Sequence, residues 1–171
     1  MTAKQPSSQK TSKEVNFRRV SDTTDFFRVM GTNINGPEYT NKLGFYDDFL
    51  RSFIKVDHIQ RGRISCTLVT KGQICNGFGR LHGGAIGSFV EVLATACART
   101  VVAEDKELFL GEISISYLSA TPLNEEVVAN AAMVKTGRNL TVVTLEFKLK
   151  KTGNLLYVTH ATFYNMPVAS L

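Results

Sequence analysis

The sequence predicts an α+β fold, in which an antiparallel β-sheet wraps around one long central helix. A long helical pattern follows a glycine-rich stretch and continues to about Val102. From residue 109 onward, the sequence shows strand patterns joined by tight turns. A single apolar helix beside such a sheet has to be covered by it, because the apolar surface of the helix would otherwise stay in water.

The composition is that of one soluble globular domain. The 171 residues are 43% hydrophobic and 20% charged, which is ordinary for a chain that buries a sizeable core. The net charge of +5 favours an anionic ligand, such as a phosphate-bearing cofactor. The sequence has no basic patch interleaved with aromatic residues and no helix-turn-helix or RNA-recognition signature, so we expect no nucleic-acid partner.

The cysteines and the apolar segments indicate the compartment. Three cysteines lie far apart, which suits a reducing, cytoplasmic environment: Cys66, Cys75 and Cys97. The most apolar stretch, residues 85–98, is interrupted by polar side chains and is too short to span a membrane, so we expect no membrane insertion. A mitochondrial or peroxisomal location is the alternative. Residues 1–15 lack the arginines of a transit peptide, and residues 169–171 resemble the peroxisomal Ser-Lys-Leu signal only weakly.

Two segments precede the predicted domain. Residues 1–15 are rich in Lys, Ser, Thr and Gln, and we expect them to form a disordered tail. Residues 16–44 form an N-terminal extension of helix and loop. Within it, residues 22–30 carry the pattern of a short amphipathic helix, and residues 32–43 contain the Gly, Pro and Asn of a loop.

A short helix and a hairpin are expected before the glycine-rich stretch. Phenylalanine recurs every four positions between residues 44 and 53, which predicts a helix. Residues 54–59 and 63–69 show strand patterns, and Gly62 lies in the turn between them. These two strands should pair as an antiparallel hairpin.

Four strands follow the long helix. In the first of them, isoleucine and tyrosine alternate with glutamate and serine, as in a half-buried strand. The turns contain Pro122, Gly137 and Gly153. The predicted strands cover residues 109–118, 126–135, 140–149 and 155–164.

Residues 76–85 have the parts needed for acyl-transfer chemistry. The four glycines between Gly77 and Gly84 allow bare backbone N–H groups to approach a ligand closely. The helix that follows stabilises negative charge at its N-terminus. Glu91 lies in that helix eight residues after Gly83, which is about 12 Å along the axis. This distance is long for one site, so the acid that completes a given Gly83 is expected to come from a partner chain.

A polar stripe interrupts the apolar helix. Ser88, Glu91 and Thr95 recur at i, i+3 and i+7 and therefore share one helical face. The stripe indicates that this face meets something polar. The alternative for Glu91 is an exposed helix residue or a buried acid paired with Arg99 or a lysine.

The glycine-rich motif carries a family resemblance. The pattern Asn76-x-x-Gly79-x-x-His82-Gly83-Gly84-Ala85, followed by a carboxylate nine positions after the histidine, resembles the hotdog-fold acyl-CoA thioesterases. It is most similar to the thioesterase superfamily proteins of animals and to bacterial phenylacetyl-CoA thioesterases. The resemblance covers residues 45–166, leaves residues 167–171 as a C-terminal tail, and implies the hotdog fold.

The resemblance implies a role for each matching residue. Glu91 would be the general base or nucleophile, and the Gly83 N–H would polarise the thioester carbonyl as an oxyanion hole. His82 would orient the loop or the carbonyl, and Asn76 would hold the attacking water or the thioester. In this fold two subunits pair edge to edge, and each site takes its acid from the partner subunit. A homodimer is therefore the minimum assembly, and a homotetramer is expected.

The expected substrate is an acyl-CoA, whose phosphates need a basic surface. In the family, the turn that holds Gly137 and Arg138 lies near the nucleotide; solvated turn charge is the alternative. We expect no metal, because His58 and His160 are spaced unlike metal ligands, and no cofactor apart from the coenzyme A of the substrate. The predicted substrate-binding residues are Gly84, Ser88, Thr95, Tyr117, Lys135, Gly137 and Arg138.

One departure from the family pattern leaves the mechanism open. The related branch has a serine near the start of the third strand, where this chain has Leu110. Either Ser114 or Ser116 substitutes for it, or the water is held differently. The alternative role of His82 is to cap the helix, and that of Asn76 is to form a turn.

The predicted function is hydrolysis of an acyl-CoA thioester to the free acid and coenzyme A, within fatty acid metabolism. The alternative from another class is a non-catalytic protein that binds acyl-CoA or lipid. A hotdog dehydratase is disfavoured, because the glycine loop and the acid match the thioesterase spacing.

Overall fold

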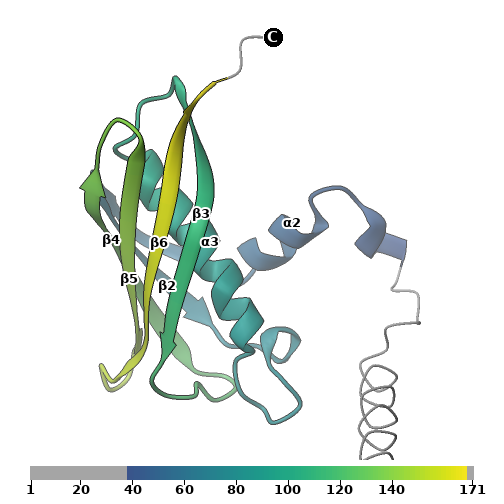
Figure 1. Ribbon diagram of the computed structural model, residues 1–171. Helices are drawn as coiled ribbons and strands as arrows, with labels where there is room; N and C mark the ends of the chain where they lie inside the picture. Colours follow the sequence, from purple (N-terminus) through teal and green to yellow (C-terminus); the bar gives the residue numbers. More distant parts are fainter. Residues whose placement is uncertain (1–37, 169–171) are drawn as a thin grey trace, which may run out of the picture. The chain divides into compact units, whose positions relative to one another are not determined.

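The computed structural model describes residues 38–168, which belong to two compact units (Figure 1). The described part of the first unit holds a 3₁₀-helix, η1, at Glu38–Asn41, within a stretch predicted to be loop. The predicted tail at 1–15 and the predicted helix at 22–30 lie outside the described residues. The second unit begins at Tyr46 and contains the sheet.

Six strands form one antiparallel sheet in the order β1-β2-β4-β5-β6-β3. The long helix α3 (Gly83–Arg99) packs across one face of this sheet, and the short helix α2 (Phe45–Arg51) leads into β1 (Figure 1). The predicted α+β fold, an antiparallel sheet around one long helix, is therefore confirmed. The strands are β1 (Ile54–Gln60), β2 (Arg63–Val69), β3 (Lys106–Tyr117), β4 (Glu126–Thr136), β5 (Leu140–Leu149) and β6 (Leu155–Pro167).

The core lies between α3 and the sheet. Helix residues such as Phe89 and Leu93, one turn apart, are buried. They meet alternate residues of the central strands, such as Leu145 and Phe147 of β5. Burial of each such side chain contributes about 1.5–3 kcal/mol, so this packing fixes the helix and the loop at its N-terminus. No helix within residues 38–168 is long and apolar enough to cross a membrane.

The predicted end of α3 near Val102 is wrong, because Thr100 caps the helix at Arg99. The Thr100 Oγ1 donates a hydrogen bond to the Cys97 carbonyl at 2.7 Å. The same oxygen accepts a hydrogen bond from the Gly62 N–H at 2.7 Å. The cap therefore ties the end of α3 to the turn between β1 and β2.

Strands β3 and β6 are both longer than their sequence patterns predict. β3 begins at Lys106 and β6 ends at Pro167, because these two ends pair with each other. Backbone pairing of this kind extends a strand through residues whose sequence does not alternate between apolar and polar side chains. The predicted boundaries of β5, in contrast, are confirmed.

A β-bulge interrupts the pairing of β3 with β6 between Leu110 and Glu112. The residue in the bulge is Gly111, and a Cβ atom there would lie 2.3 Å from Cε2 of Tyr164. The bulge shifts the alternation of side chains, so that Leu110 and Ile113 both pack toward the core. It thereby decides which residues of β3 face α3.

Candidate active site

Asn76 shapes the loop that leads into α3. Its Oδ1 accepts hydrogen bonds from the N–H groups of Phe78 at 3.0 Å and Arg80 at 3.2 Å. The backbone closes the same turn, since the Asn76 N–H donates to the Arg80 carbonyl at 2.8 Å. Gly79 completes the turn with a φ of 66°, a conformation that glycine adopts without strain. The amide N–H groups of Asn76 have no acceptor among residues 38–168, so they are free to donate to a ligand.

His82 caps the N-terminus of α3 with its side chain. Its Nδ1 accepts a hydrogen bond from the Gly84 N–H at 3.0 Å, and its backbone is extended, with φ −69° and ψ 134°. The proton of the neutral ring is therefore assigned to Nε2. This geometry matches the capping alternative for His82, and it also holds the first turn of the helix in place.

The Gly83 N–H opens the helix and has no acceptor within residues 38–168. The first N–H groups of an α-helix lack an intrahelical partner, and His82 satisfies the next one, that of Gly84. The Gly83 carbonyl accepts a hydrogen bond from the Tyr117 hydroxyl at 3.0 Å, which ties the end of β3 to the start of α3. Gly83 therefore presents a positioned donor at the positive end of a helix dipole.

A hollow of about 440 Å³ brings three of the predicted site residues together. Asn76, Gly83 and Tyr117 all line it. Its floor includes Tyr157, which is buried and bonded to Thr121 at 2.7 Å; burial raises the pKa of its phenol. We call this site the glycine hollow.

A second hollow, of about 500 Å³, contains the predicted polar stripe of α3. Ser88, Glu91 and Thr95 line it, together with Tyr46 and Asp47 of α2. We call it the acid hollow. The Ser88 Oγ donates to the Gly84 carbonyl at 3.1 Å and is also hydrogen-bonded to the Tyr46 hydroxyl.

The Glu91 carboxylate is exposed and has no hydrogen bond or ion pair with any residue between 38 and 168. The alternative of a buried acid paired with Arg99 is wrong, because the Arg99 guanidinium donates to the Lys106 carbonyl at 2.6 Å instead. Glu91 is therefore available to a substrate or to a partner chain.

One chain does not bring Glu91 to Gly83. The two hollows share no lining residue, and the two positions are about 12 Å apart along the helix. A single site that uses both groups has to combine two copies of the chain.

The predicted phosphate-binding turn also lies away from the glycine hollow. Lys135 is the second-last residue of β4, and Gly137 and Arg138 form the turn into β5, at the opposite end of the sheet from Tyr117 (Figure 1). The Gly137 carbonyl accepts from the Asn165 side chain at 2.8 Å, which anchors the turn. These three residues therefore reach a glycine hollow only from another copy of the chain.

The serines proposed to replace the missing family serine lie on the wrong face. Ile113 and Ile115 pack toward the core, and alternation along β3 sends Ser114 and Ser116 to the opposite face of the sheet. Leu110 itself packs against the core. Neither serine can hold a water on the helix side of its own chain.

Comparison with known proteins finds a family model that matches part of the chain. The sequence model of the Thioesterase superfamily matches residues 78–155, which include the start of α3 and Glu91. Over this segment the chain is similar to the thioesterase superfamily. The hotdog fold that the sequence resemblance implied is thus confirmed.

Two named relatives of this chain are distant. Human acyl-coenzyme A thioesterase 13 is 25% identical over 95 residues, which cover 56% of this chain and 67% of the human protein. A Caenorhabditis elegans protein, provisionally named an esterase, is 29% identical over 97 residues. That alignment covers 57% of this chain and only 57% of the length of the relative.

Solved thioesterase structures share the fold. Zebrafish thioesterase superfamily member 2 aligns with a TM-score of 0.66 and 24% identity, over 73% of this chain and 88% of the zebrafish chain. A Streptococcus mutans protein solved with bound acetyl CoA aligns with a TM-score of 0.62 and 17% identity, over 67% of this chain and 89% of the other.

Sequence reasoning missed some residues that line the hollows of this chain. Tyr46 and Asp47 reach the acid hollow, although the phenylalanine pattern around them indicated only a buried helix face. Arg80 is the charged side chain that lines the glycine hollow. Within residues 38–168, no three His, Cys, Asp or Glu side chains gather as metal ligands.

Proposed function

We propose that this thioesterase superfamily member hydrolyses an acyl-CoA thioester to the free acid and coenzyme A. The observation that carries the proposal is the free Gly83 N–H at the N-terminus of α3, in one hollow with the amide of Asn76. Two donors in residues that line one hollow suit a carbonyl oxygen that gains negative charge during attack.

The chemistry needs no group beyond these side chains and water. Glu91 takes a proton from water, the water oxygen forms a bond to the thioester carbon, and the carbonyl oxygen becomes an oxyanion held by the Gly83 N–H. When the tetrahedral intermediate collapses, the C–S bond breaks and the sulfur leaves as the coenzyme A thiolate, which takes up a proton. In the alternative route, the Glu91 carboxylate attacks the carbon directly, and water then hydrolyses the resulting anhydride.

The proposal requires a homodimer, in which Glu91 of one chain faces the glycine hollow of the other. β3 lies at the edge of the sheet and offers an unpaired backbone to a second copy of itself. A further pairing of dimers would give the tetramer expected from the resemblance.

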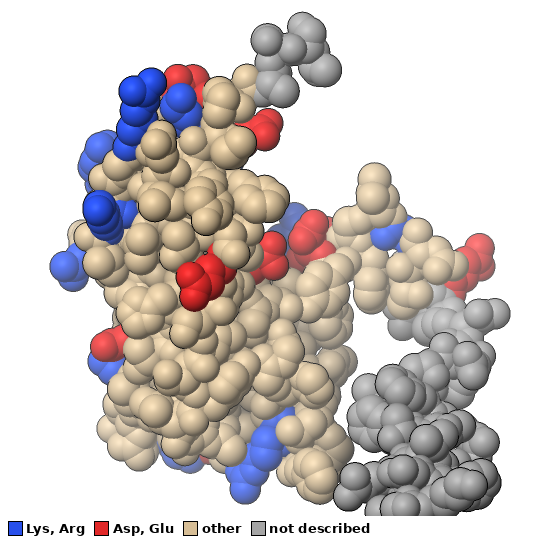
Figure 2. All heavy atoms as spheres, in the orientation of Figure 1, with Lys and Arg blue, Asp and Glu red and all other residues tan. Residues whose placement is uncertain are grey.

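The basic turn between β4 and β5 would hold the coenzyme A phosphates. Lys135 and Arg138 are exposed there and have no ion pair within residues 38–168. Lys and Arg side chains gather over this end of the sheet in Figure 2. In the dimer, this turn would bind the phosphates of the coenzyme A whose thioester lies in the glycine hollow of the partner. The phosphates would stay at the surface. The cytoplasm remains the proposed location, since it keeps thiols reduced.

The relatives support an acyl-CoA substrate but leave the acyl group open. The human relative is named an acyl-coenzyme A thioesterase, and the Streptococcus mutans protein binds acetyl CoA. A second candidate function is non-catalytic binding of acyl-CoA. It is favoured by one observation, the apolar Leu110 at the position where the family serine would help to hold the water.

Release of free thiol from a panel of acyl-CoAs separates the two functions. We expect the wild type to consume at least one acyl-CoA, and Glu91→Gln to lose about a hundredfold or more in kcat, because it removes the general base. The matched control is Glu126→Gln, which removes an exposed acid whose ion pair with Lys150 contributes little. Full activity of folded Glu91→Gln would contradict the mechanism, and an inactive wild type that still binds acyl-CoA would favour the binding protein.

A further inference from the structure

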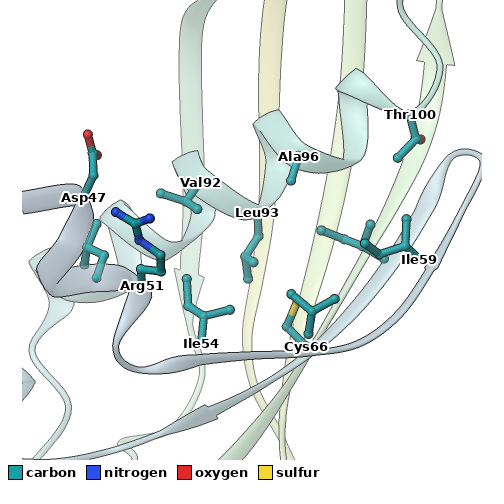
Figure 3. Close-up of a pocket in the computed structure, with 12 residues that line it drawn as sticks. Asp47, Arg51, Ile54, Ile59, Cys66, Val92, Leu93, Ala96 and Thr100 are labelled. Atoms are coloured by element: carbon teal, nitrogen blue, oxygen red, sulfur yellow. The ribbon is translucent and has the colours of Figure 1, made fainter. Parts of the chain in front are cut away.

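An apolar pocket of about 510 Å³ lies between α3 and the hairpin of β1 and β2 (Figure 3). The two strands line it with aliphatic side chains, and the helix closes it from the other side with Leu93 and Ala96. The lining residues that define its character are Ile54, Val56, Ile59, Ile64, Leu93 and Cys66. We call it the hairpin pocket.

The hairpin pocket adjoins the acid hollow. Asp47, Leu50, Val92 and Ala96 line both spaces. Val92 directly follows Glu91 in the helix. The path from the carboxylate into the pocket thus follows one face of α3. A molecule whose reactive end lies at Glu91 can therefore place its other end in the hairpin pocket.

The far end of the pocket offers no free polar group. Thr100 lies there, but its hydroxyl donates to the Cys97 carbonyl and accepts from the Gly62 N–H, both at 2.7 Å. Cys66 is buried, and desolvation raises the pKa of its thiol, so the sulfur stays neutral. An apolar methyl end fits these surroundings, whereas a charged or hydrogen-bonding end would lose its water without compensation.

We infer that the hairpin pocket takes the tail of a medium-chain aliphatic acyl group, within a single subunit. This inference rests on the proposed function, because it places the thioester at Glu91. This position of the acyl tail, inside one subunit, differs from a tunnel that runs between two subunits. It also disfavours aryl substrates, because no aromatic side chain lines the pocket to receive a ring.

The depth of the pocket sets the length of the tail. From Val92 to Thr100 the helix advances eight residues, or about 12 Å. An extended chain advances about 1.2 Å per bond, so the pocket holds roughly eight to ten carbons. Each buried methylene should raise kcat/KM about fourfold until the pocket is full, and longer tails should gain nothing more.

The test places a bulky side chain in the hairpin pocket from the helix side. Ala96 is exposed on α3 and lines the pocket, so Ala96→Phe should place a ring in it without disturbing the core. We expect the wild type to prefer acyl chains of about eight to twelve carbons. Ala96→Phe should lose more than tenfold in kcat/KM on these chains. Val56 lines the hairpin pocket from the strand side and lies outside the acid hollow. Val56→Trp should therefore give the same loss on these chains and change less than twofold on acetyl-CoA.

The matched control is Ala103→Phe, which adds the same ring at an exposed alanine outside the pocket and should leave the length profile unchanged. Size-exclusion chromatography checks that all variants assemble alike. The inference is overturned if both pocket variants keep the wild-type profile, or if an aryl-CoA is the best substrate.

A binding measurement separates this inference from the proposed function. The probe is decyl-CoA, in which a thioether replaces the thioester and cannot be hydrolysed. Weaker binding of this probe by Ala96→Phe, but not by Ala103→Phe, supports the pocket even if the wild type hydrolyses nothing. Equal binding by all three proteins overturns it.

Discussion

Gly83 combines two roles that a substitution can separate. As a small residue it lets the Tyr117 ring lie close to the start of α3, and as the first helical residue it supplies the free N–H. A Cβ atom at this position would lie 3.5 Å from the Tyr117 hydroxyl, which is ordinary contact. The role proposed for Gly83 therefore depends on its N–H, not on the absence of a side chain.

Gly83→Pro removes the N–H and should keep the helix. Proline is favoured at the first position of a helix, and His82 already has the extended backbone that a residue before proline requires. We expect Gly83→Pro to lose about 10²–10³-fold in kcat, the magnitude for loss of one oxyanion-hole donor. Gly83→Ala, which keeps the N–H, should stay within a few-fold of the wild type.

Steady-state thiol release, with circular dichroism to verify folding, measures both variants. Equal activity of folded Gly83→Pro and Gly83→Ala would show that the N–H takes no part in the reaction.

Three residues that the sequence predicts for the site line the glycine hollow, whereas His82 and Gly84 of the same motif line a different hollow. Asn76, Gly83 and Tyr117 meet as expected, because the loop and the start of the helix are local structures. The capping bond of His82 was one of two alternatives, since a histidine before Gly-Gly suits both a cap and a catalytic group. Tyr46 could not be predicted, because its contact with Ser88 joins residues 42 positions apart.

At the scale of elements, the bulge in β3 controls which side chains face α3. Without it, the alternation would put Leu110 and Ile113 on opposite faces, and both pack toward the core only because Gly111 adds one residue. The Tyr164 ring covers Gly111 so closely that no side chain fits between them. Bulge and tyrosine together thus place the end of β3, with Tyr117, against the start of α3.

Gly111→Ala should destabilise the protein by about 1–3 kcal/mol, because the new methyl group forces the Tyr164 ring or the strand to move. Gly72→Ala is the matched control, since a Cβ atom there meets nothing within 4 Å and the residue does not have positive φ. Urea unfolding of both variants gives the free energies. A Gly111→Ala variant as stable as Gly72→Ala would mean that the ring does not hold this position.

Elements with strong local patterns were predictable, and strand ends set by pairing were not. β5 has clean alternation and its predicted bounds agree with the structure. β3 and β6 extend beyond their predicted ends, since Lys106 and Pro167 are ordered by their pairing rather than by their own side chains. The bulge was also invisible in the sequence, because Gly111 alone does not distinguish a bulge from a weak strand position.

At the scale of the whole molecule, the proposed mechanism divides one site between two copies of the chain. The glycine hollow has the donors, the acid hollow has the carboxylate, and the helix between them is rigid. The basic turn of β4 and β5 forms a third part at the other end of the sheet (Figure 2). These positions are consistent with an assembly in which each chain completes the site of another.

Activity of mixed inactive variants tests this claim most directly. Glu91→Gln lacks the acid and Gly83→Pro lacks the donor, so each should be nearly inactive alone. Equal amounts refolded together should form mixed dimers in half of the assemblies, and each mixed dimer has one intact site out of two. The account therefore predicts about a quarter of the wild-type activity. Activity no higher than that of the separate variants, in a preparation shown to contain mixed dimers, would contradict a site shared between subunits.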